Sequence, residues 1–345
     1  MKALFVTKVA TDQCVFALVE AFARQAHRDF FVLPLWRFKE SLGSDLTCEY
    51  LRRTIRGFSP DLVIVVNFAA TVIPAEEWKD LIHTLSSPDY IFVAVDDPFI
   101  LETRKEFHLS YATQFDLVVT CDPRGVIKQE YLDAGAKRVI FFPPPAPLSF
   151  IEYAEKKSHF RVSKVTPRPL YLYGTNTYSR PPYSSPQTLS RVQICKAISE
   201  EIRVNLYGPD SFTSEFAELP QVTTHGFLPY KNIPRTVAGK VLLTPSVRPT
   251  ANVPARFLEA CACGALMVTE LSEFSRRIGR DDEEKNLVRQ LFYEIGSLEG
   301  CKQAILTASK MEYKDAMKIS GALLAFAREW NFERMLGEMQ AALRH

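Results

Sequence analysis

No segment of the sequence has the pattern of a membrane anchor or a secretory leader. The first residues, MKALFVTKVATDQC, contain no apolar region followed by a cleavage site, which a signal peptide requires. No apolar run approaches the roughly 20 residues that a helix needs to cross a bilayer. We therefore expect a cytoplasmic protein without a membrane span.

Cysteine is sparse, and glycine is missing where one large class of enzymes needs it. The seven cysteines show no paired spacing, as is typical of a reducing compartment. Cys261 and Cys263 point to different sides of a predicted helix, so we expect them in the core and not on zinc. The segment Lys8–Thr11 follows the first predicted strand and contains no glycine. This argues against a nicotinamide-dependent oxidoreductase, whose phosphate-binding turn is built from glycines.

What is present describes an ordinary globular protein with room for two domains. The chain has 345 residues, of which 47% are hydrophobic and 24% are charged. Its net charge of +2 is uneven, because residues 1–150 hold 16 Lys+Arg and 19 Asp+Glu, and the remainder holds 26 and 21. A basic second half favours a phosphate-bearing ligand there over an extended nucleic-acid surface.

Short runs rich in Val, Ile and Phe alternate with helical patterns along most of the chain. The predicted strands are Ala3–Thr7, Phe30–Leu33, Asp61–Asn67, Tyr90–Asp96, Asp116–Cys121 and Arg138–Phe142, followed by Leu170–Tyr173, Arg203–Tyr207, Val222–His225, Lys240–Thr244 and Leu266–Thr269. Such alternation indicates βαβ units, and hence parallel sheets that are covered by helices on both faces.

The alternation of strand and helix patterns is interrupted once, over Pro143–Arg168. This segment is rich in proline and then in charge, so we interpret it as the connection between two domains. We therefore predict an N-terminal Rossmann-like domain over residues 1–150 and a C-terminal Rossmann-like domain over residues 151–325. The tail from Lys314 to Arg344 has a helical pattern throughout.

The stretch Pro254–Glu270, PARFLEACACGALMVTE, predicts one helix followed by one buried strand. Arg256 and Glu259 are three residues apart, so they share one face of this helix. A cation in the first turn opposes the helix dipole unless an anion binds there, and helix N-termini bind phosphate through free N–H groups. Glu259, one turn deeper, could accept hydrogen bonds from two ribose hydroxyls. The alternative is an i,i+3 salt bridge on a solvated face.

This stretch resembles the nucleotide-sugar site of GT-B glycosyltransferases. The likeness is greatest to the CgeB-like (spore-maturation type) group, with its R-x-x-E-x-x-x-x-G-x-x-x-x-T pattern, and looser to phage DNA β-glucosyltransferases. It implies an α/β fold of two Rossmann-like parallel-sheet domains that face a central cleft, with a C-terminal helix over residues 326–345 crossing back toward the N-terminal domain. Arg256 would meet the diphosphate and Glu259 the ribose. Ala251 stands where many retaining enzymes carry another Glu, which favours inversion.

Aspartates at the ends of predicted strands are the candidate catalytic groups. The fourth strand ends in Asp96-Asp97-Pro98, and the resemblance implies that Asp96 is the general base, with Asp97 as the second choice. Asp97 also suits the start of the next helix. Asp122 is expected to cap the helix after the fifth strand, with acceptor contact as the alternative. Asn67, at the end of the third strand, is a further candidate for acceptor contact.

The remaining candidate donor contacts lie in the second half. Gly174 would permit close backbone approach to the ligand, Arg180 and Arg191 are expected on the diphosphate, and Leu228 on the base, which favours uridine. Ser246 and Asn252 are placed at the sugar–phosphate pocket. No Asp-x-Asp metal motif stands at the matching strand end, so we expect no metal and no cofactor beyond the nucleotide-sugar donor.

The resulting hypothesis is a metal-independent, inverting glycosyltransferase that uses a nucleotide-sugar donor, most simply a UDP-sugar. Polysaccharide, protein and small-molecule acceptors all remain open. A DNA-modifying glucosyltransferase that acts on a hydroxymethylated base is an alternative, although the acidic first half disfavours it. A UDP-sugar 2-epimerase and a catalytically silent nucleotide-sugar binding protein are two further alternatives.

Overall fold

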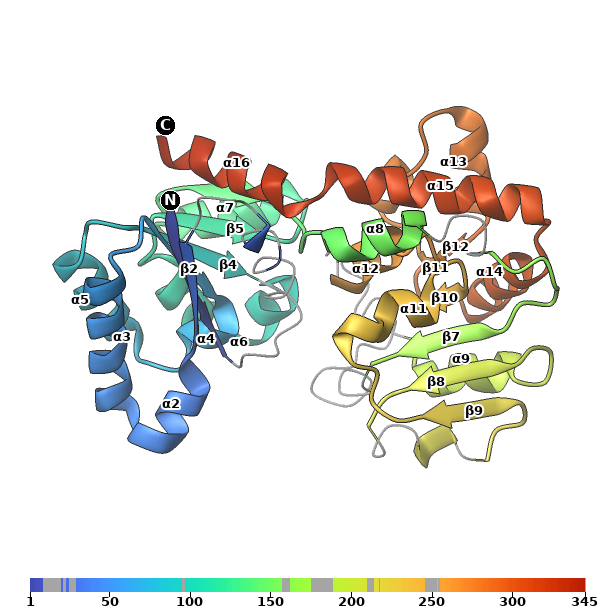
Figure 1. Cartoon of the computed structure of the whole chain (residues 1–345), viewed down its shortest axis with the longest axis horizontal. Helices are drawn as coiled ribbons and strands as arrows, with labels where there is room; N and C mark the ends of the chain where they lie inside the picture. Colours follow the sequence, from blue (N-terminus) through green and yellow to red (C-terminus); the bar gives the residue numbers. More distant parts are fainter. Residues whose placement is uncertain are drawn as a thin grey trace. The chain divides into compact units, whose positions relative to one another are not determined.

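The computed structural model describes residues 1–8, 20, 23–24, 29–94, 97–156, 162–174, 189–209, 214–216, 218–245, 253 and 255–344, with residues 97–104 and 255 described by their backbone alone. The chain divides into two compact units (Figure 1). Unit 1 comprises Met1–Pro147, Asn252–Ala255 and Trp330–His345. Unit 2 comprises Leu148–Ala251 and Arg256–Glu329.

Unit 1 is built on a six-stranded parallel sheet with the strand order β2-β1-β3-β4-β5-β6. The strands are β1 (Lys2–Thr7), β2 (Asp29–Pro34), β3 (Leu62–Val66), β4 (Asp89–Ala94), β5 (Leu117–Thr120) and β6 (Val139–Phe141). The described helices are α2 (Leu35–Leu42), α3 (Ser44–Phe58), α4 (Asn67–Ala70), α5 (Ala75–Thr84), α6 (Asp97–Ala112), α7 (Gly125–Asp133) and α16 (Phe332–Arg344). The central strands are apolar along their whole length because helices cover both faces of a parallel sheet.

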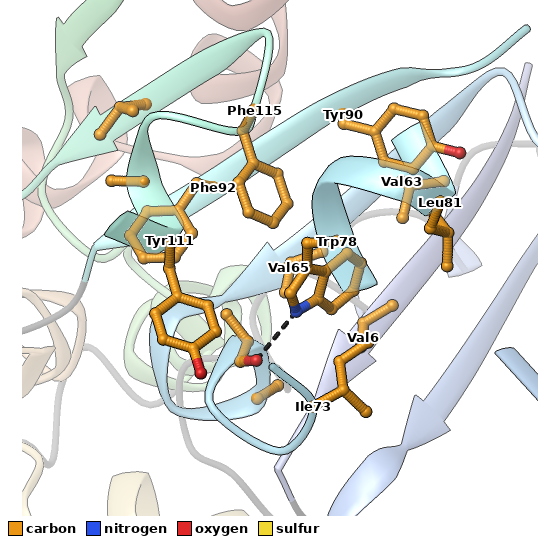
Figure 2. Packing of buried hydrophobic residues seen from close by; sticks show 14 of the residues in the cluster. Val6, Val63, Val65, Ile73, Trp78, Leu81, Tyr90, Phe92, Tyr111 and Phe115 are labelled. Atoms are coloured by element: carbon orange, nitrogen blue, oxygen red, sulfur yellow. Dashed lines mark hydrogen bonds between the residues drawn. The ribbon is translucent and has the colours of Figure 1, made fainter. Parts of the chain in front are cut away.

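Aromatic side chains fill the core of unit 1 (Figure 2). Trp78 on α5 is fully buried, and its indole N–H donates to the carbonyl of Ala70 at 2.8 Å, so no polar group is left unsatisfied there. The ring of Phe115 lies 5.4 Å from that of Trp78 and 5.2 Å from that of Phe92. Through Phe115, these contacts join α5 to β4.

Unit 2 repeats the arrangement with the strand order β12-β11-β10-β7-β8-β9, again parallel. Its strands are β7 (Leu170–Tyr173), β8 (Val204–Tyr207), β9 (Val222–His225), β10 (Val241–Leu243), β11 (Leu266–Glu270) and β12 (Phe292–Tyr293). Its described helices are α8 (Leu148–Lys156), α9 (Arg191–Ile198), α11 (Ile233–Val237), α12 (Ala255–Ala262), α13 (Asp282–Arg289), α14 (Leu298–Lys310) and α15 (Tyr313–Glu329), with short 3-10 turns at η3 (Ser214–Phe216), η4 (Tyr230–Asn232) and η5 (Ser275–Arg277). The predicted α/β fold class of two Rossmann-like parallel sheets is confirmed.

The predicted helix and strand over Pro254–Glu270 are found as α12 and β11. Gly264, with a φ of +57°, ends the helix in the left-handed conformation that favours glycine. The backbone N–H of Ala265 donates to the carbonyl of Ala260 at 3.1 Å, which closes the turn. The first turn of α12 lies beside the end of β7, because Arg256 of this turn lies over the ring of Tyr173, the last residue of β7.

The segment Pro143–Arg168, which we interpret as the connection between two domains, contains α8, and α8 contacts α11 and α15 inside unit 2. One expectation about the course of the chain is wrong. The tail was predicted to be helical throughout, but it breaks between α15 and α16. There the carbonyl of Trp330 accepts a hydrogen bond from the N–H of Ala146 at 2.9 Å. The ring of Trp330 packs edge-on against Phe142, so tertiary contacts in unit 1 interrupt the helix.

Candidate functional site

The candidate site lies where β7 ends and α12 begins, in unit 2. Tyr173 is the last residue of β7, and its hydroxyl donates a hydrogen bond of 2.8 Å to Oε2 of Glu259 on α12. Both side chains are buried, with 7% of Tyr173 and 3% of Glu259 exposed. The bond joins residues that are 86 positions apart in the chain, so the sheet and the helix together create it.

Glu259 is a buried carboxyl group with a fixed orientation. Burial raises its pKa above the ordinary value, while the hydrogen bond from Tyr173 and the positive charge of Arg256 act in the opposite direction. The pKa of Tyr173 is raised well above its ordinary value, first by burial and then by the negative charge of Glu259. Tyr173 therefore keeps its proton and occupies one carboxylate oxygen, and within the described residues no side chain donates to the second oxygen.

The guanidinium group of Arg256 lies beside Tyr173 and Gly174. Its guanidinium carbon lies 5.6 Å from the centroid of the Tyr173 ring, a cation–π distance. Gly174 makes this position possible, because a Cβ atom there would lie 2.6 Å from Nη2 of Arg256. The φ of Gly174, +133°, also belongs to a region that side chains rarely adopt. The close approach predicted at Gly174 is thus made by a guanidinium group.

The alternative interpretation of Arg256 and Glu259 as a salt bridge on a solvated helix face is wrong. Glu259 is buried and bonded to Tyr173, and Arg256 is half-buried. Among the residues that the structure describes, Arg256 forms no ion pair with a carboxylate; its recorded partner is the Tyr173 ring. A half-buried cation in the first turn of a helix leaves a positive group ready for an anion.

Of the other residues predicted to contact the nucleotide-sugar donor, the structure describes some and not others. Arg191 is buried as the first residue of α9, whose N-terminus carries a capping box formed by Ser190 and Gln193. Leu228 follows β9 and lines a groove on unit 2. Arg180, Ser246 and Asn252 lie outside the described residues, so their roles stay predictions.

The candidate catalytic aspartates follow β4 in unit 1, as the sequence predicts. Asp97 is the first residue of α6. Asp96, and the side chain of Asp97, lie outside the described part of the chain, and their roles remain predictions. Asn67, the first residue of α4, is buried, and its Oδ1 accepts from the N–H of Phe68 at 3.0 Å.

The expectation that Asp122 caps the next helix is wrong. α7 begins at Gly125, and its N-cap residue is Arg124, with no capping side-chain hydrogen bond. The buried carboxylate of Asp122 instead accepts three hydrogen bonds from the Arg124 guanidinium, at 2.9 and 3.1 Å from Nε and at 2.7 Å from Nη2, and a fourth from the Arg124 N–H. A nearby guanidinium with two parallel donors competes better for a carboxylate than a helix end does.

Tyr173 is the site residue that sequence reasoning missed. The available signal was an aromatic residue with a hydroxyl group at the last position of a predicted strand, directly before glycine. Within the described residues, no group of three or more His, Cys, Asp or Glu side chains could hold a metal ion. In the same part of the chain, every helix is too short or too polar to cross a membrane.

No protein-family model matches the chain, and no curated protein matches its sequence. Solved structures do resemble it. An α,α-trehalose-phosphate synthase (UDP-forming) from Burkholderia xenovorans, in complex with glucose-6-phosphate, is 10% identical over 100% of both chains, with a TM-score of 0.63. An α-glucosyltransferase in complex with UDP and a 13-mer DNA containing a HMU base is 11% identical over 100% of this chain and 99% of that one, with a TM-score of 0.62.

A third similar structure is the DNA-modifying enzyme β-glucosyltransferase, whose substrate is uridine diphosphoglucose. It is 11% identical over 99% of both chains, with a TM-score of 0.51. Because function belongs to sites and not to folds, likeness at these identities shows the architecture. Together with the two six-stranded parallel sheets, it shows that the chain has the GT-B glycosyltransferase fold.

Proposed function

We propose that the chain is a glycosyltransferase that moves a sugar from a nucleotide-sugar donor to an acceptor hydroxyl. The observation that carries this proposal is the buried Glu259, held by Tyr173 beside the half-buried Arg256 at the start of α12. In open parallel sheets, ligands bind outside the carboxyl ends of the strands, and this group of residues lies at the end of β7. A carboxylate and a cation about one helical turn apart suit a ribose and its diphosphate.

Each residue has a defined part in donor binding. The free oxygen of Glu259 accepts from a ribose hydroxyl, while the Tyr173 hydroxyl prevents the carboxylate from rotating. Arg256 neutralises the diphosphate together with the N–H groups of the first turn of α12. Arg191 and Arg180 are proposed to add further positive charge, Leu228 to contact a uracil base, and Ser246 and Asn252 to contact the sugar.

Transfer itself needs a base for the acceptor hydroxyl, and we assign this role to Asp96, with Asp97 as the second choice. Asp96 takes the proton while the acceptor oxygen attacks the anomeric carbon, and the bond from that carbon to the diphosphate oxygen breaks with inversion. Arg256 stabilises the charge that develops on the departing diphosphate, so we propose that no metal ion is required. Membership of the CgeB-like group stays a prediction of the motif.

UDP binding tests the donor site directly. We expect Glu259→Ala and Arg256→Ala to weaken UDP binding by about tenfold or more, because a hydrogen bond to a charged group contributes about 1.5–3 kcal/mol. Glu273→Ala and Arg276→Ala, which remove exposed side chains of the same types from the segment after β11, are the matched controls. Isothermal titration measures the affinities, and equal UDP affinity in all four variants would refute the assignment.

Product analysis tests the reaction class. The wild type is incubated with UDP-glucose or UDP-N-acetylglucosamine and with saccharide, protein or small-molecule acceptors, with and without EDTA. We expect acceptor-dependent release of UDP that EDTA does not change. Asp96→Asn should keep its UDP affinity and lose transfer. A sugar converted without acceptor would identify an epimerase instead, and binding without any turnover would identify a silent binding protein.

DNA modification is the second candidate, and the specific observation behind it is that two of the similar structures are glucosyltransferases described with DNA or as DNA-modifying. Duplex DNA that contains a hydroxymethylated base therefore belongs in the acceptor panel, with unmodified DNA of the same sequence as its control. Transfer of labelled glucose to the modified duplex alone would establish this candidate.

A further inference from the structure

One face of α3 in unit 1 carries apolar side chains that the fold leaves exposed. Leu46 is 59% exposed and Tyr50 is 36% exposed, and the two lie one helical turn apart. Leu42, the last residue of α2, adds an apolar side chain that is 43% exposed. The rings of Phe38 on α2 and Tyr50 stack at 4.4 Å, so the two helices, which Figure 1 shows one after the other, form one surface. Neighbouring exposed apolar side chains mark an interaction surface.

The same face of α3 has acidic residues in its first half and basic residues in its second half. Asp45 and Glu49 are followed by Arg53 and Arg56. In a helix of 3.6 residues per turn, these four positions fall within about 80° of one another around the axis. The side chains of Glu49 and Arg53 are 43% and 76% exposed, and Asp45 and Arg56 are exposed as well. The apolar side chains of α3 continue this face on one side, and the buried residues of α3 lie on the opposite side.

The fold leaves most of these charges available to a partner. Glu49 accepts a hydrogen bond of 2.7 Å from Nε of Arg53, an exposed i,i+4 pair of a kind that contributes little to stability and can exchange partners. Among the residues that the structure describes, neither Asp45 nor Arg56 forms an ion pair. Arg52, at the edge of this face, is instead held by two carboxylates of α5.

The balance of charge on this face decides which class of partner fits. The two acidic and two basic side chains cancel, so a nucleic acid or an anionic lipid surface would meet as much repulsion as attraction. A protein surface with the opposite order of charges would be attracted along its whole length. α3 itself has that order when it is turned end for end, because reversing the helix exchanges its acidic and basic halves.

A second copy of α3 placed antiparallel to the first satisfies the charges pairwise. The two-fold axis then crosses the middle of α3, near Leu51. Glu49 of one copy faces Arg53 of the other, because the two positions are equally far from the axis. Asp45 of one copy likewise lies near Arg56 of the other. The symmetry forms each pair twice.

Gly57 leaves room for an apolar side chain of the second copy. A Cβ atom at Gly57 would meet nothing within 4 Å, so the backbone of the last turn of α3 is open. Leu46 precedes the middle of α3 by nearly as many residues as Gly57 follows it. In the antiparallel pair, Leu46 therefore packs over Gly57 of the second copy, where the missing side chain allows close approach.

We propose that this face of α3, extended by Leu42, binds a second copy of the chain in a two-fold arrangement with the two α3 helices antiparallel. One helix face is small for a protein interface, so we expect a dissociation constant of about 1–100 µM. All residues of the interface lie in unit 1, and none of them belongs to the proposed donor site in unit 2. The proposal therefore does not rest on the proposed transferase function.

An exchange of charges between two variants tests the interface. Asp45→Arg/Glu49→Arg makes the charged positions of the face wholly basic. Arg53→Glu/Arg56→Glu makes them wholly acidic. Each variant alone should self-associate at least about tenfold more weakly than the wild type, because like charges then face each other. An equimolar mixture of the two should form a dimer at least as tight as that of the wild type, whereas a variant that failed to fold would not regain association on mixing.

Sedimentation velocity at concentrations from about 1 to about 200 µM measures the dissociation constants. Leu46→Asp should also weaken the dimer by about tenfold, because it places a charge in an apolar contact. Val165→Asp is its matched control, at a position of unit 2 that is 75% exposed. Arg276→Glu/Arg277→Glu, which reverses two exposed charges of unit 2, controls for net charge. Raising the salt concentration from about 0.05 M to about 0.5 M should weaken the wild-type dimer.

Two kinds of result would overturn the proposal. A wild type that stays monomeric at the highest concentration would leave this face to a different partner, and a mixture of the two charge variants that associates no more than its components would exclude the antiparallel pairing. Association of the wild type that both charge variants retain would place the contact elsewhere on the chain.

Discussion

Gly174 shows how the absence of one side chain shapes the candidate donor site. A Cβ atom at this position would lie 2.6 Å from Nη2 of Arg256, and the φ of +133° is strained for any other residue. We expect Gly174→Ala to displace the guanidinium from the Tyr173 ring and to weaken UDP binding by about tenfold. The backbone strain should lower the free energy of unfolding by about 1–3 kcal/mol.

Gly57→Ala is the matched control for this variant. Gly57 lies in α3, and a Cβ atom there meets nothing within 4 Å. Alanine should stabilise that helix by about 0.5–1 kcal/mol and leave UDP binding unchanged. Isothermal titration and urea denaturation measure both effects, and a Gly174→Ala variant with wild-type UDP affinity would contradict the role given to the glycine.

The raised pKa of Glu259 predicts that donor binding depends on pH. Ribose hydroxyls donate to the ionised carboxylate, so UDP affinity should fall as the pH is lowered through this pKa. Tyr173→Phe removes a hydrogen bond that favours the ionised form, and so should raise the pKa further and move the fall to higher pH. Titrations that begin at the ordinary carboxyl pKa of 4.5 and continue upward measure the midpoint. Glu259→Gln should show no such fall, and an unshifted midpoint in Tyr173→Phe would count against the mechanism.

At the scale of elements, α6 and α7 are joined by a buried polar pair. Nε2 of His108 lies 2.7 Å from the hydroxyl of Tyr131, and the imidazole is 4% exposed. Burial lowers the pKa of His108 from 6.5 to about 4. Between these two values the unfolded chain binds a proton that the folded chain does not, so acidification should destabilise the fold.

We expect His108 to contribute a loss of up to about 3 kcal/mol in the free energy of unfolding as the pH falls from 6.5 to about 4. His108→Gln should remove this contribution to the pH dependence, while His83→Gln, at an exposed position of α5, should retain it. Urea denaturation at several pH values measures the slope. Equal slopes in the wild type and His108→Gln would show that the imidazole is protonated in the fold.

For the whole molecule, the break between α15 and α16 decides which unit the end of the chain stabilises. Trp330 packs its ring against Phe141 at 5.9 Å and Phe142 at 5.4 Å, and α16 contacts β5, all within unit 1. Trp330→Ala should therefore destabilise unit 1 by about 3–5 kcal/mol, the usual cost of a truncated buried tryptophan.

Hydrogen exchange followed by mass spectrometry reports on each unit separately. In Trp330→Ala we expect faster exchange in peptides from β5 and β6 and unchanged exchange in peptides from β7 to β9. Trp36→Ala is the control, because Trp36 on α2 is 36% exposed. Faster exchange confined to unit 2 would show that the tail supports the other sheet.

The longer strands were predicted best, and the short edge strand and the helix in the connecting segment were predicted worst. Leu170–Tyr173 and Val222–His225 were predicted with the bounds that the structure has. β12, with two residues, carries too short a pattern to detect. α8 was not predicted, because it lies in the segment Pro143–Arg168, whose prolines and charges were interpreted as a connection between domains. Of the candidate site, Arg256 and Glu259 were identifiable from their spacing, whereas Tyr173 was not.

The order of strands and helices, and with it the two parallel sheets, follows from local patterns in the sequence, because a strand buried on both faces must be a continuous local run of apolar residues. Which polar groups contact one another depends on the folded structure. Tyr173 and Glu259 form a hydrogen bond although they are 86 residues apart. Asp122 accepts hydrogen bonds from the Arg124 guanidinium and does not cap a helix. The ring of Trp330 packs against Phe142 at the point where the helical pattern of the tail is interrupted. Burial and partners depend on residues that are far apart in the chain, and no local pattern encodes them.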